Sequence, residues 1–400
     1  YGCAGAAAAS ALPFAPVLAQ SPDNDKEILV VVFLRGGCDG LHLLAPVSDK
    51  NYIDARAANL RIAESGNERG LALSNTLNNL DFCLHPSAKA LFELYQSKQL
   101  ALIHAAGLSN GTRSHFDAQD LIERGINAKA NLAEGWLARY LRLHATHTSD
   151  NLLPAVALRS LPLALQGSTQ AVSMDSPRDY ALKGDARLMG LVKSLYADNS
   201  STLGKAAQRT IETIRELQKK TIPDLSPQYP SDWHARRFAD SLQAIAQLIK
   251  MDVGLHVATC DFGGWDTHEN QAWAFNQLTA TLANSLQAFY NDLNKFHDRL
   301  TVVVLSEFGR RLRSNRSNGT DHGHGGVMMA LGKNIKGGKM YGTWKGLATE
   351  QLDNGVDLDV TTDYRLVLGE ILQRRLAVPT NTLSSIFPDF VMPKALGFSA

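Results

Sequence analysis

The sequence predicts an α/β protein with a mostly parallel central sheet. Two runs, residues 27–34 (EILVVVFL) and 301–305 (TVVVL), are continuous, apolar and rich in β-branched side chains. Such runs are typical of strands buried on both faces of a parallel sheet. Shorter runs at 100–104 and 255–259 add further strands, and segments with helical periodicity separate them. With 400 residues, of which 44% are hydrophobic, the chain can bury a sizeable core in one large domain.

The N-terminal residues differ from the rest of the chain. Residues 1–20 (YGCAGAAAASALPFAPVLAQ) are small, apolar and uncharged, as in a secretory signal peptide without its basic start. The alternative is an alanine-rich first helix, which Pro13 and Pro16 disfavour. We therefore expect a signal-peptide remnant, and a protein that is periplasmic or secreted.

The remaining chain reads as one domain. Residues 21–26 form a charged linker, and residues 27–400 form the α/β domain. A mainly helical stretch at about 130–252 predicts an insertion or flank that covers one side of the sheet. A substrate-selecting cap is the alternative interpretation of this stretch.

Charge and motif content exclude several classes of function. Forty basic and 39 acidic residues give a net charge of +1, which does not support a nucleic-acid partner. No other run reaches the roughly 18 apolar residues that a membrane span needs. No GxGxxG or P-loop follows a predicted strand, so a nucleotide cofactor is not indicated. Cys38, Cys83 and Cys260 show no CxxC spacing, which favours buried thiols over a zinc knuckle or a disulfide framework.

Polar groups follow four of the predicted strands. Asp39 lies in the glycine turn after the first strand, and Ser114 lies where a helix begins after the second. Asp266 and His268 follow the strand at 255–259, and Glu307 follows the strand at 301–305. Because the carboxyl ends of parallel strands meet at one edge of a sheet, we expect these groups to lie close together.

Each of these groups also has an ordinary structural interpretation. Asp39 and Asp266 are well placed to cap turns or helices, and Ser114 is a suitable helix N-cap. At the same position the Ser114 hydroxyl is suited to act as a nucleophile, because the helix dipole and Arg113 favour negative charge there. His115 follows directly and completes a candidate catalytic group.

Two further imidazoles follow the strand at 301–305. The segment DHGHGG carries His322 and His324, and its glycines let the backbone approach closely. The combined carboxylates and imidazoles, without thiolates, predict one or two divalent ions. Zinc, manganese, calcium and magnesium all suit this set of ligands, and iron is a further alternative.

The motifs together resemble a known family. The segments GGCDGLHLLAP, TRSHFDAQ, GGWDTHENQ, SEFGR and GTDHGHGG are similar, in the same order, to motifs of the alkaline phosphatase superfamily. They most resemble its sulfatase- and phosphatase-like exported branch of unknown function, whose members usually carry a twin-arginine signal. The resemblance spans residues 27–390 and implies an alkaline-phosphatase-like three-layer sandwich.

The resemblance also implies roles for single residues. It assigns metal ligation and the nucleophile to the positions Asp39, Ser114, Asp266, His268, Glu307, and His322 or His324. Two departures concern the metals. Asp266 and His268 are closer in sequence than the usual Asp-x-x-x-His, and Glu307-Phe308 replaces the usual Asp-His. The second departure leaves one or two ions as alternatives.

The predicted function is an exported metal-dependent hydrolase that acts on a small anionic phosphate or sulfate ester. Arg35, Arg113 and Arg310 are predicted to bind the anionic oxygens, because a planar guanidinium matches their geometry. The main alternative is a metal-binding structural or ligand-binding protein without catalysis. An iron oxidoreductase is a weaker alternative, because no cofactor motif supports it.

Overall fold

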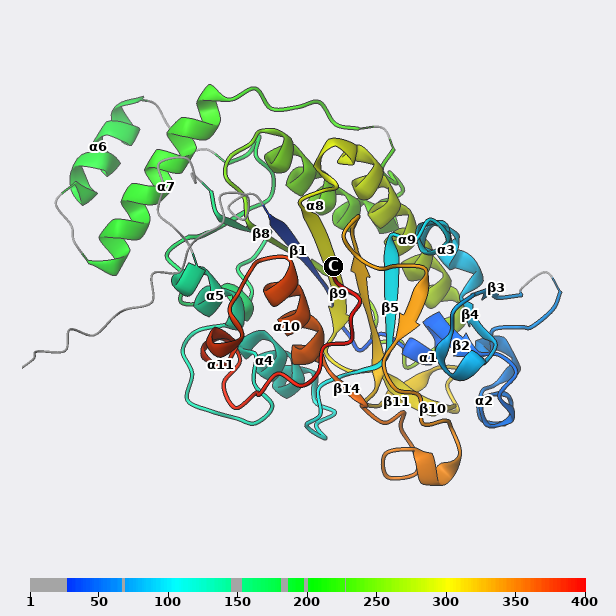
Figure 1. Cartoon of the computed structure of the whole chain (residues 1–400). Helices are drawn as coiled ribbons and strands as arrows, with labels where there is room; N and C mark the ends of the chain where they lie inside the picture. The colour runs from blue at the N-terminus through cyan, green and yellow to red at the C-terminus, as the bar shows by residue number, and fades with distance from the viewer. Residues whose placement is uncertain (1–26, 67–68, 145–152, 181–185, 198–200, 227) are drawn as a thin grey trace, which may run out of the picture.

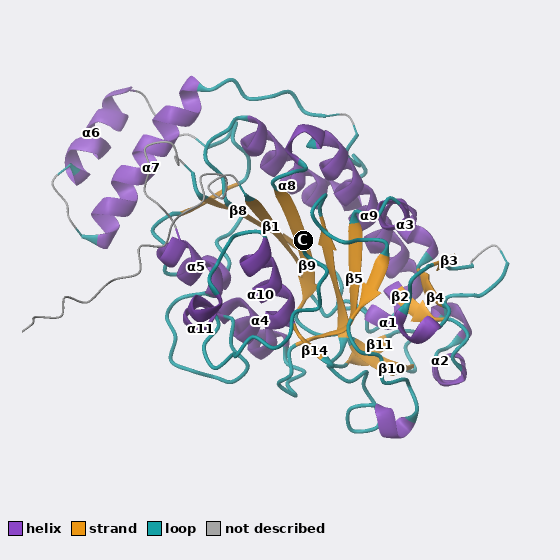
Figure 2. Cartoon of the chain, viewed as in Figure 1, coloured by secondary structure: helices purple, strands orange, loops and turns teal. Residues whose placement is uncertain are grey.

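A nine-stranded mixed sheet forms the centre of the computed structural model (Figures 1 and 2). The structure describes residues 27–66, 69–144, 153–180, 186–197, 201–226 and 228–400. The strand order is β13-β5-β12-β9-β1-β8-β6-β7, with β14 beside β5. The predicted α/β class with a large, mostly parallel sheet is therefore confirmed. The predicted signal-peptide remnant and linker, residues 1–26, lie outside the described residues.

Most of the central strands run in one direction. β1 (Ile28–Leu34) pairs in parallel with β8 (Val257–Phe262) on one side and β9 (Leu300–Ser306) on the other. β12 (Gly326–Leu331) is antiparallel to both β9 and β5 (Leu100–Gly107). β5 therefore runs in the same direction as β1, and the carboxyl ends of β1, β5, β8 and β9 lie at one edge.

Shorter strands complete the sheet and its edge. β6 (Ala155–Leu158) and β7 (Ala171–Met174) extend the sheet in parallel beyond β8. β13 (Lys339–Tyr341) and β14 (Thr362–Asp363) pair in parallel with β5. Outside the main sheet, β10 (Arg310–Ser314) and β11 (Thr320–His322) form an antiparallel hairpin. A small sheet of β2 (Leu44–Pro46), β3 (Leu71–Ala72) and β4 (Phe82–Leu84) lies apart from it.

Helices cover both faces of the main sheet (Figure 2). Alternate side chains of β1 enter two different cores, because successive residues of a strand point to opposite faces. Val30, Val32 and Leu34 belong to one core, and Leu29, Val31 and Phe33 belong to the other. The first core includes α3 (Lys89–Gln96), α8 (Trp233–Lys250) and α9 (Gln271–Asp292). The second includes α4 (His115–Arg124), α5 (Trp136–His144), α10 (Tyr364–Arg374) and α11 (Leu383–Ile386).

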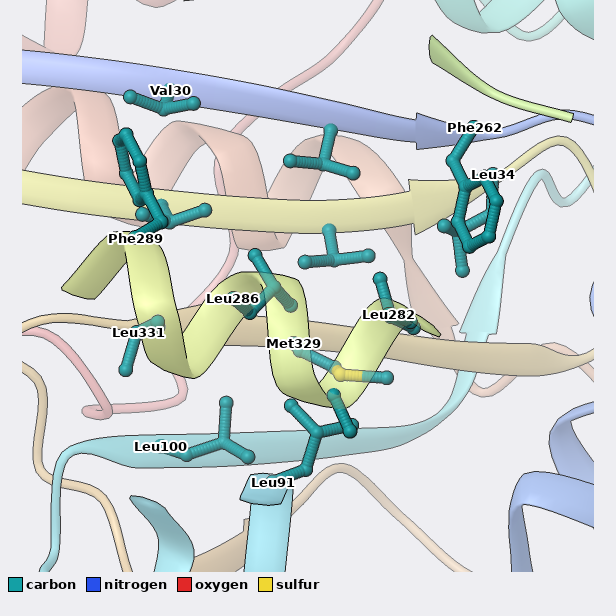
Figure 3. Packing of buried hydrophobic residues seen from close by; sticks show 14 of the residues in the cluster. Val30, Leu34, Leu91, Leu100, Phe262, Leu282, Leu286, Phe289, Met329 and Leu331 are labelled. Atoms are coloured by element: carbon teal, nitrogen blue, oxygen red, sulfur yellow. The ribbon is translucent and has the colours of Figure 1, made fainter. Parts of the chain in front are cut away.

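The long helix α9 anchors the first core. Figure 3 shows Leu282, Leu286 and Phe289 of this helix directed at the apolar side chains of the sheet, among them Val30 and Met329. All five side chains are essentially inaccessible to solvent. Their burial is a major source of stability, at roughly 25 cal/mol for each Å² of apolar surface removed from water.

The stretch at about 130–252, predicted as a mainly helical insertion or flank, contributes to several layers. Its strands β6 and β7 belong to the main sheet, and its helices α5 and α8 lie on opposite faces. Its other helices, α6 (Ala186–Tyr196) and α7 (Thr202–Lys219), form a pair at one end of the molecule (Figure 1).

The cysteines of the described residues agree with the expectation of buried thiols. Cys38, Cys83 and Cys260 are free and buried, as their spacing suggests. None of the helices in the described part of the chain combines the length and the apolar character that crossing a membrane requires.

His104 connects β5 to β2 as a neutral imidazole. Its Nδ1 accepts a hydrogen bond from the backbone N–H of Ala105 at 2.8 Å, and its Nε2 donates to the Leu44 carbonyl at 2.9 Å. Burial lowers the pKa of His104 from 6.5 to about 4. The unfolded chain therefore takes up a proton before the folded protein does, and the stability that the neutral ring contributes is present above pH 6.5.

We expect the free energy of unfolding to fall as the pH is lowered from 6.5 towards 4, because protonation then favours the unfolded chain. Urea unfolding at pH 7.5, 6 and 5 measures this slope. His104→Gln should be less stable at pH 7.5 and should show a shallower slope. An unchanged slope in the variant would contradict the assignment of the neutral ring.

Candidate metal centre

The first side chain of the candidate centre is His115, in the first turn of α4. Ser114 caps this helix, because its Oγ accepts a hydrogen bond from the backbone N–H of Asp117 at 3.4 Å. His115 Nδ1 lies 2.8 Å from Oε1 of Glu307, the residue that directly follows β9. Since a carboxylate can only accept, Nδ1 carries a proton, and Nε2 is directed towards Asp266, 3.4 Å from its Oδ2. That Nε2 is buried and has no hydrogen-bond partner.

Glu307 is a positioning group for His115. The residue is inaccessible to solvent, and its Oε1 also accepts from the backbone N–H of Gly36 at 2.8 Å and from Gln119 Nε2 at 2.9 Å. Burial raises the pKa of Glu307, but the hydrogen bonds from His115 and Gln119 lower it by more. The net shift of the pKa is therefore downward. In return, the hydrogen bond with Glu307 raises the pKa of His115.

His322, at the end of β11, has the same arrangement. Its Nδ1 lies 2.8 Å from the carbonyl oxygen of Arg113, which can only accept, so Nδ1 carries the proton. Its Nε2 then faces Asp266 Oδ1 at 3.2 Å. Burial lowers the pKa of His322, which keeps the ring neutral near pH 7.

His268 is the third imidazole at this edge. Its Nδ1 lies 3.2 Å from Asp321 Oδ1, and Asn315 Nδ2 donates to the same oxygen at 3.0 Å. Its Nε2 lies 2.9 Å from the Nε2 of His322 and 3.0 Å from Asp266 Oδ1. Asp321 therefore orients His268 as Glu307 orients His115.

Asp266 lies between the three rings. Gly36 makes this position possible: it has a φ of +120°, and an added Cβ would lie 2.4 Å from the backbone nitrogen of Asp266. Arg310 Nη2 donates to Asp266 Oδ1 at 2.5 Å. Burial raises the pKa of Asp266, but the hydrogen bond and charge of Arg310 outweigh it and lower the pKa to about 2. The carboxylate is thus ionised at neutral pH.

These groups converge on one point. One ligand atom each from His115, Asp266 and His322 lies within 4.8 Å of the other two, and His268 Nε2 is in contact with two of them. Imidazole lone pairs that face a carboxylate repel it unless a proton or a metal cation lies between them. Imidazole nitrogen with carboxylate oxygen is a ligand set that suits zinc and related divalent ions. Carboxylate or carbonyl acceptors on the opposite ring nitrogen are the usual support of metal-binding histidines.

We call His115, Asp266, His268 and His322 the four-residue centre. Asp266 and His268 expose 48% and 38% of their side chains, and His115 and His322 each expose 23%. Structural zinc sites are closed, whereas catalytic sites keep a position open for water or substrate. The exposed side chains of the four-residue centre match a site with a position open to water or substrate.

Asp39 lies outside the four-residue centre. Its carboxylate forms a buried ion pair with Arg56, at 2.5 and 2.9 Å, and accepts from Gln271 Nε2 at 2.7 Å. It also caps α1 (Gly40–Leu43) through the N–H of His42. Burial raises the pKa of Asp39, but the charge of Arg56 holds it well below its usual range. A metal at Asp39, as predicted, would have to displace Arg56.

The arginines predicted to bind substrate all contact protein groups. Arg35 pairs with Glu123 and with Asp261, and Arg113 pairs with Asp357. Arg310 is buried, and besides Asp266 it donates to the backbone carbonyl oxygens of Gly36, Gly37, Trp265 and Thr320. In this structure, Arg310 joins the loops that carry the centre.

Sequence reasoning assigned some of these residues differently. The structure brings the predicted ligands Asp266, His268 and His322 together, and it adds His115, which was predicted as a catalytic group. His324, also predicted as a ligand, instead contacts Asp353. Asp321 was missed, although its position directly before His322 in the DHGHGG segment is a signal for a supporting carboxylate.

A family model described as "Protein of unknown function (DUF1501)" matches residues 26–379. The chain belongs to this family. The family of unknown function expected from the motifs is thus confirmed, while the alkaline phosphatase superfamily and the twin-arginine branch stay predictions. A search of curated proteins found no match.

Two solved structures are similar to the DUF1501 chain. A protein described as a 2-O GAG sulfatase has a TM-score of 0.40 and 10% identity, covering 92% of this chain and 76% of that one. Ps i-CgsB has a TM-score of 0.34 and 10% identity, covering 79% and 68%. At these identities and scores, the likeness says nothing about chemistry.

The contacts of Arg310 predict its effect on stability. Arg310→Met removes a buried charge and leaves Asp266 and several carbonyl oxygens without a donor, so we expect a loss of about 3–5 kcal/mol in the free energy of unfolding. Urea unfolding measures it. Arg311→Met is the matched control on the same strand and should change stability by less than about 1 kcal/mol. Equal stability of Arg310→Met and the wild type would contradict a structural role.

Proposed function

We propose that this DUF1501 protein is a metal-dependent hydrolase of small phosphate or sulfate esters, with one divalent ion at the four-residue centre. One observation carries the proposal. The Nδ1 atoms of His115, His268 and His322 each face an oxygen acceptor, so their Nε2 lone pairs all point towards Asp266. Three imidazoles and one carboxylate suit zinc best, and manganese next.

The residues around the centre have separate tasks in this proposal. A divalent ion held there supplies Lewis acidity towards a phosphoryl or sulfuryl oxygen. Ser114 directly precedes His115, and its hydroxyl at the N-terminus of α4 is our candidate nucleophile, since the helix dipole favours developing negative charge. Glu307 and Asp321 keep His115 and His268 in the tautomer that binds metal.

The order of the motifs supports membership of the alkaline phosphatase superfamily with its three-layer sandwich, but with one ion at this centre. The second ion of that superfamily would need Asp39 and the position of Glu307. Here Asp39 is paired with Arg56, and Glu307 holds His115. We therefore propose that both carboxylates are structural.

A second candidate function is a metal-binding protein without catalysis. The engagement of Arg35, Arg113 and Arg310 by protein carboxylates favours it, because these are the guanidinium groups that were expected to bind an anionic substrate. Ester hydrolysis with and without metal distinguishes the two functions.

Export to the periplasm or the medium is proposed on separate grounds. The small, apolar residues 1–20 support it through their likeness to a signal peptide. Fractionation of cells that express the full-length gene tests it, and protein confined to the cytoplasm would contradict it.

The metal ligands predict the outcome of substitution. His322→Ala should lower the affinity for Zn²⁺ by at least about 10-fold, and Glu307→Gln by about 10–100-fold through loss of orientation. Titration calorimetry of chelator-treated protein measures both. His297→Ala is the control, because this ring stacks on Tyr290 away from the centre. Wild-type affinity in His322→Ala would contradict the centre.

The proposed nucleophile has its own test. Ser114→Ala should abolish hydrolysis of p-nitrophenyl phosphate and p-nitrophenyl sulfate while Zn²⁺ affinity stays unchanged. Loss of the helix cap should cost about 1 kcal/mol of stability, so thermal unfolding is recorded in parallel. Full activity in the variant would show that Ser114 is a cap alone.

A further inference from the structure

A second group of ligands lies beside the four-residue centre. We propose that a second divalent cation binds between His324, Asp353 and Asp357. One ligand atom from each residue lies within 4.8 Å of the other two. His324 lies between β11 and β12, and both aspartates belong to the loop after the short helix η7 (Thr349–Gln351). The proposal goes beyond the hydrolase centre, with which it shares no ligand.

His324 is arranged like the rings of the four-residue centre: one ring nitrogen faces an oxygen acceptor, and the other faces carboxylates. Its Nε2 lies 3.1 Å from the carbonyl oxygen of Gly111, which can only accept, so Nε2 carries the proton. Its Nδ1 contacts Asp353 Oδ2 and lies 3.9 Å from Asp357 Oδ2. A lone pair on Nδ1 would repel the two carboxylates it faces, and a cation between the three groups would remove that repulsion.

Asp357 has a buried carboxylate oxygen without a hydrogen-bond partner, which is a separate indication of a cation at this site. The residue is inaccessible to solvent, and its Oδ2 accepts from Nε and Nη2 of Arg113. Its Oδ1 has no hydrogen-bond partner, although the guanidinium of Arg311 lies nearby, with Nε 3.8 Å from this oxygen. A buried carboxylate oxygen without a partner is costly, and direct coordination of a cation would offset that cost.

A proton on His324 is the competing explanation. An imidazolium would donate to both Asp353 and Gly111, but it would leave Asp357 Oδ1 without a partner. A cation coordinated by Asp353, Asp357 and His324 Nδ1 accounts for all of these groups at once. We therefore prefer the cation.

The ligand types indicate which ion would bind. An imidazole nitrogen with two carboxylates favours zinc or manganese over calcium and magnesium, which prefer oxygen alone. The His324 side chain is 7% exposed, whereas that of Asp353 is 29% exposed. The ion would therefore enter from the side of Asp353.

A cation at this second site would stabilise the geometry of the hydrolase centre. Arg113 connects the two groups, because its side chain binds Asp357 while its carbonyl oxygen accepts from His322 Nδ1. A cation that fixes Asp357 would hold Arg113, and through it the orientation of His322. The proposed role of the second cation is thus structural.

Zinc stoichiometry tests the proposal. Full-length protein is treated with chelator, loaded with Zn²⁺, dialysed and analysed by elemental mass spectrometry, with calorimetry to count sites. We expect two equivalents in the wild type and in the control His297→Gln. Asp353→Asn, His324→Gln and His322→Gln should each bind one. Asp357 is left unchanged because its ion pair with Arg113 stabilises the fold, and circular dichroism verifies folding of each variant.

The outcomes separate the two sites. One equivalent in the wild type that Asp353→Asn and His324→Gln keep but His322→Gln loses would overturn the second site and leave the hydrolase centre standing. One equivalent that His322→Gln keeps but the other variants lose would support the second site and overturn the hydrolase centre. No bound zinc in the wild type would overturn both.

Discussion

The buried guanidinium of Arg310 is the contact on which the geometry of the sheet edge depends. It joins the glycine turn after β1, the segment after β8 and the β10–β11 hairpin through their backbone carbonyl oxygens. The same group lowers the pKa of Asp266 against the opposing effect of burial. A buried charge persists only when its hydrogen bonds are satisfied, so these loops cannot separate without a large loss of stability. The carboxylate of the centre is thereby held in place before any ion binds.

A second constraint sets the chemistry of the histidines. Glu307, Asp321 and the Arg113 carbonyl oxygen each occupy the Nδ1 side of one ring. Because these partners only accept, each ring is held as the tautomer whose Nε2 can bind metal. Burial of Glu307 makes its bond to His115 stronger than the same contact would be in water. The centre is therefore pre-organised on parts of the chain that are distant in sequence.

Many of the residues at the carboxyl edge of the main sheet were predictable from the sequence. The other contacts were not, because they depend on how distant parts of the chain pack together. The apolar runs of β1, β8 and β9 predict parallel strands, and the polar residues that follow β8 and β9 predict that Asp266 and His322 meet. The pairing of Asp39 with Arg56 follows no motif, because it depends on how α2 (Lys50–Ala55) packs against β10. The role of Asp357 likewise depends on the path of a long loop, which no local periodicity encodes.

Anomalous scattering from a crystal of the zinc-loaded protein tests the central claim most directly. We expect a zinc peak about 2 Å from Nε2 of His115, His268 and His322 and from a carboxylate oxygen of Asp266, as expected for zinc ligands. Side chains that keep the arrangement described here around an empty centre, in a crystal whose zinc lies elsewhere, would contradict it.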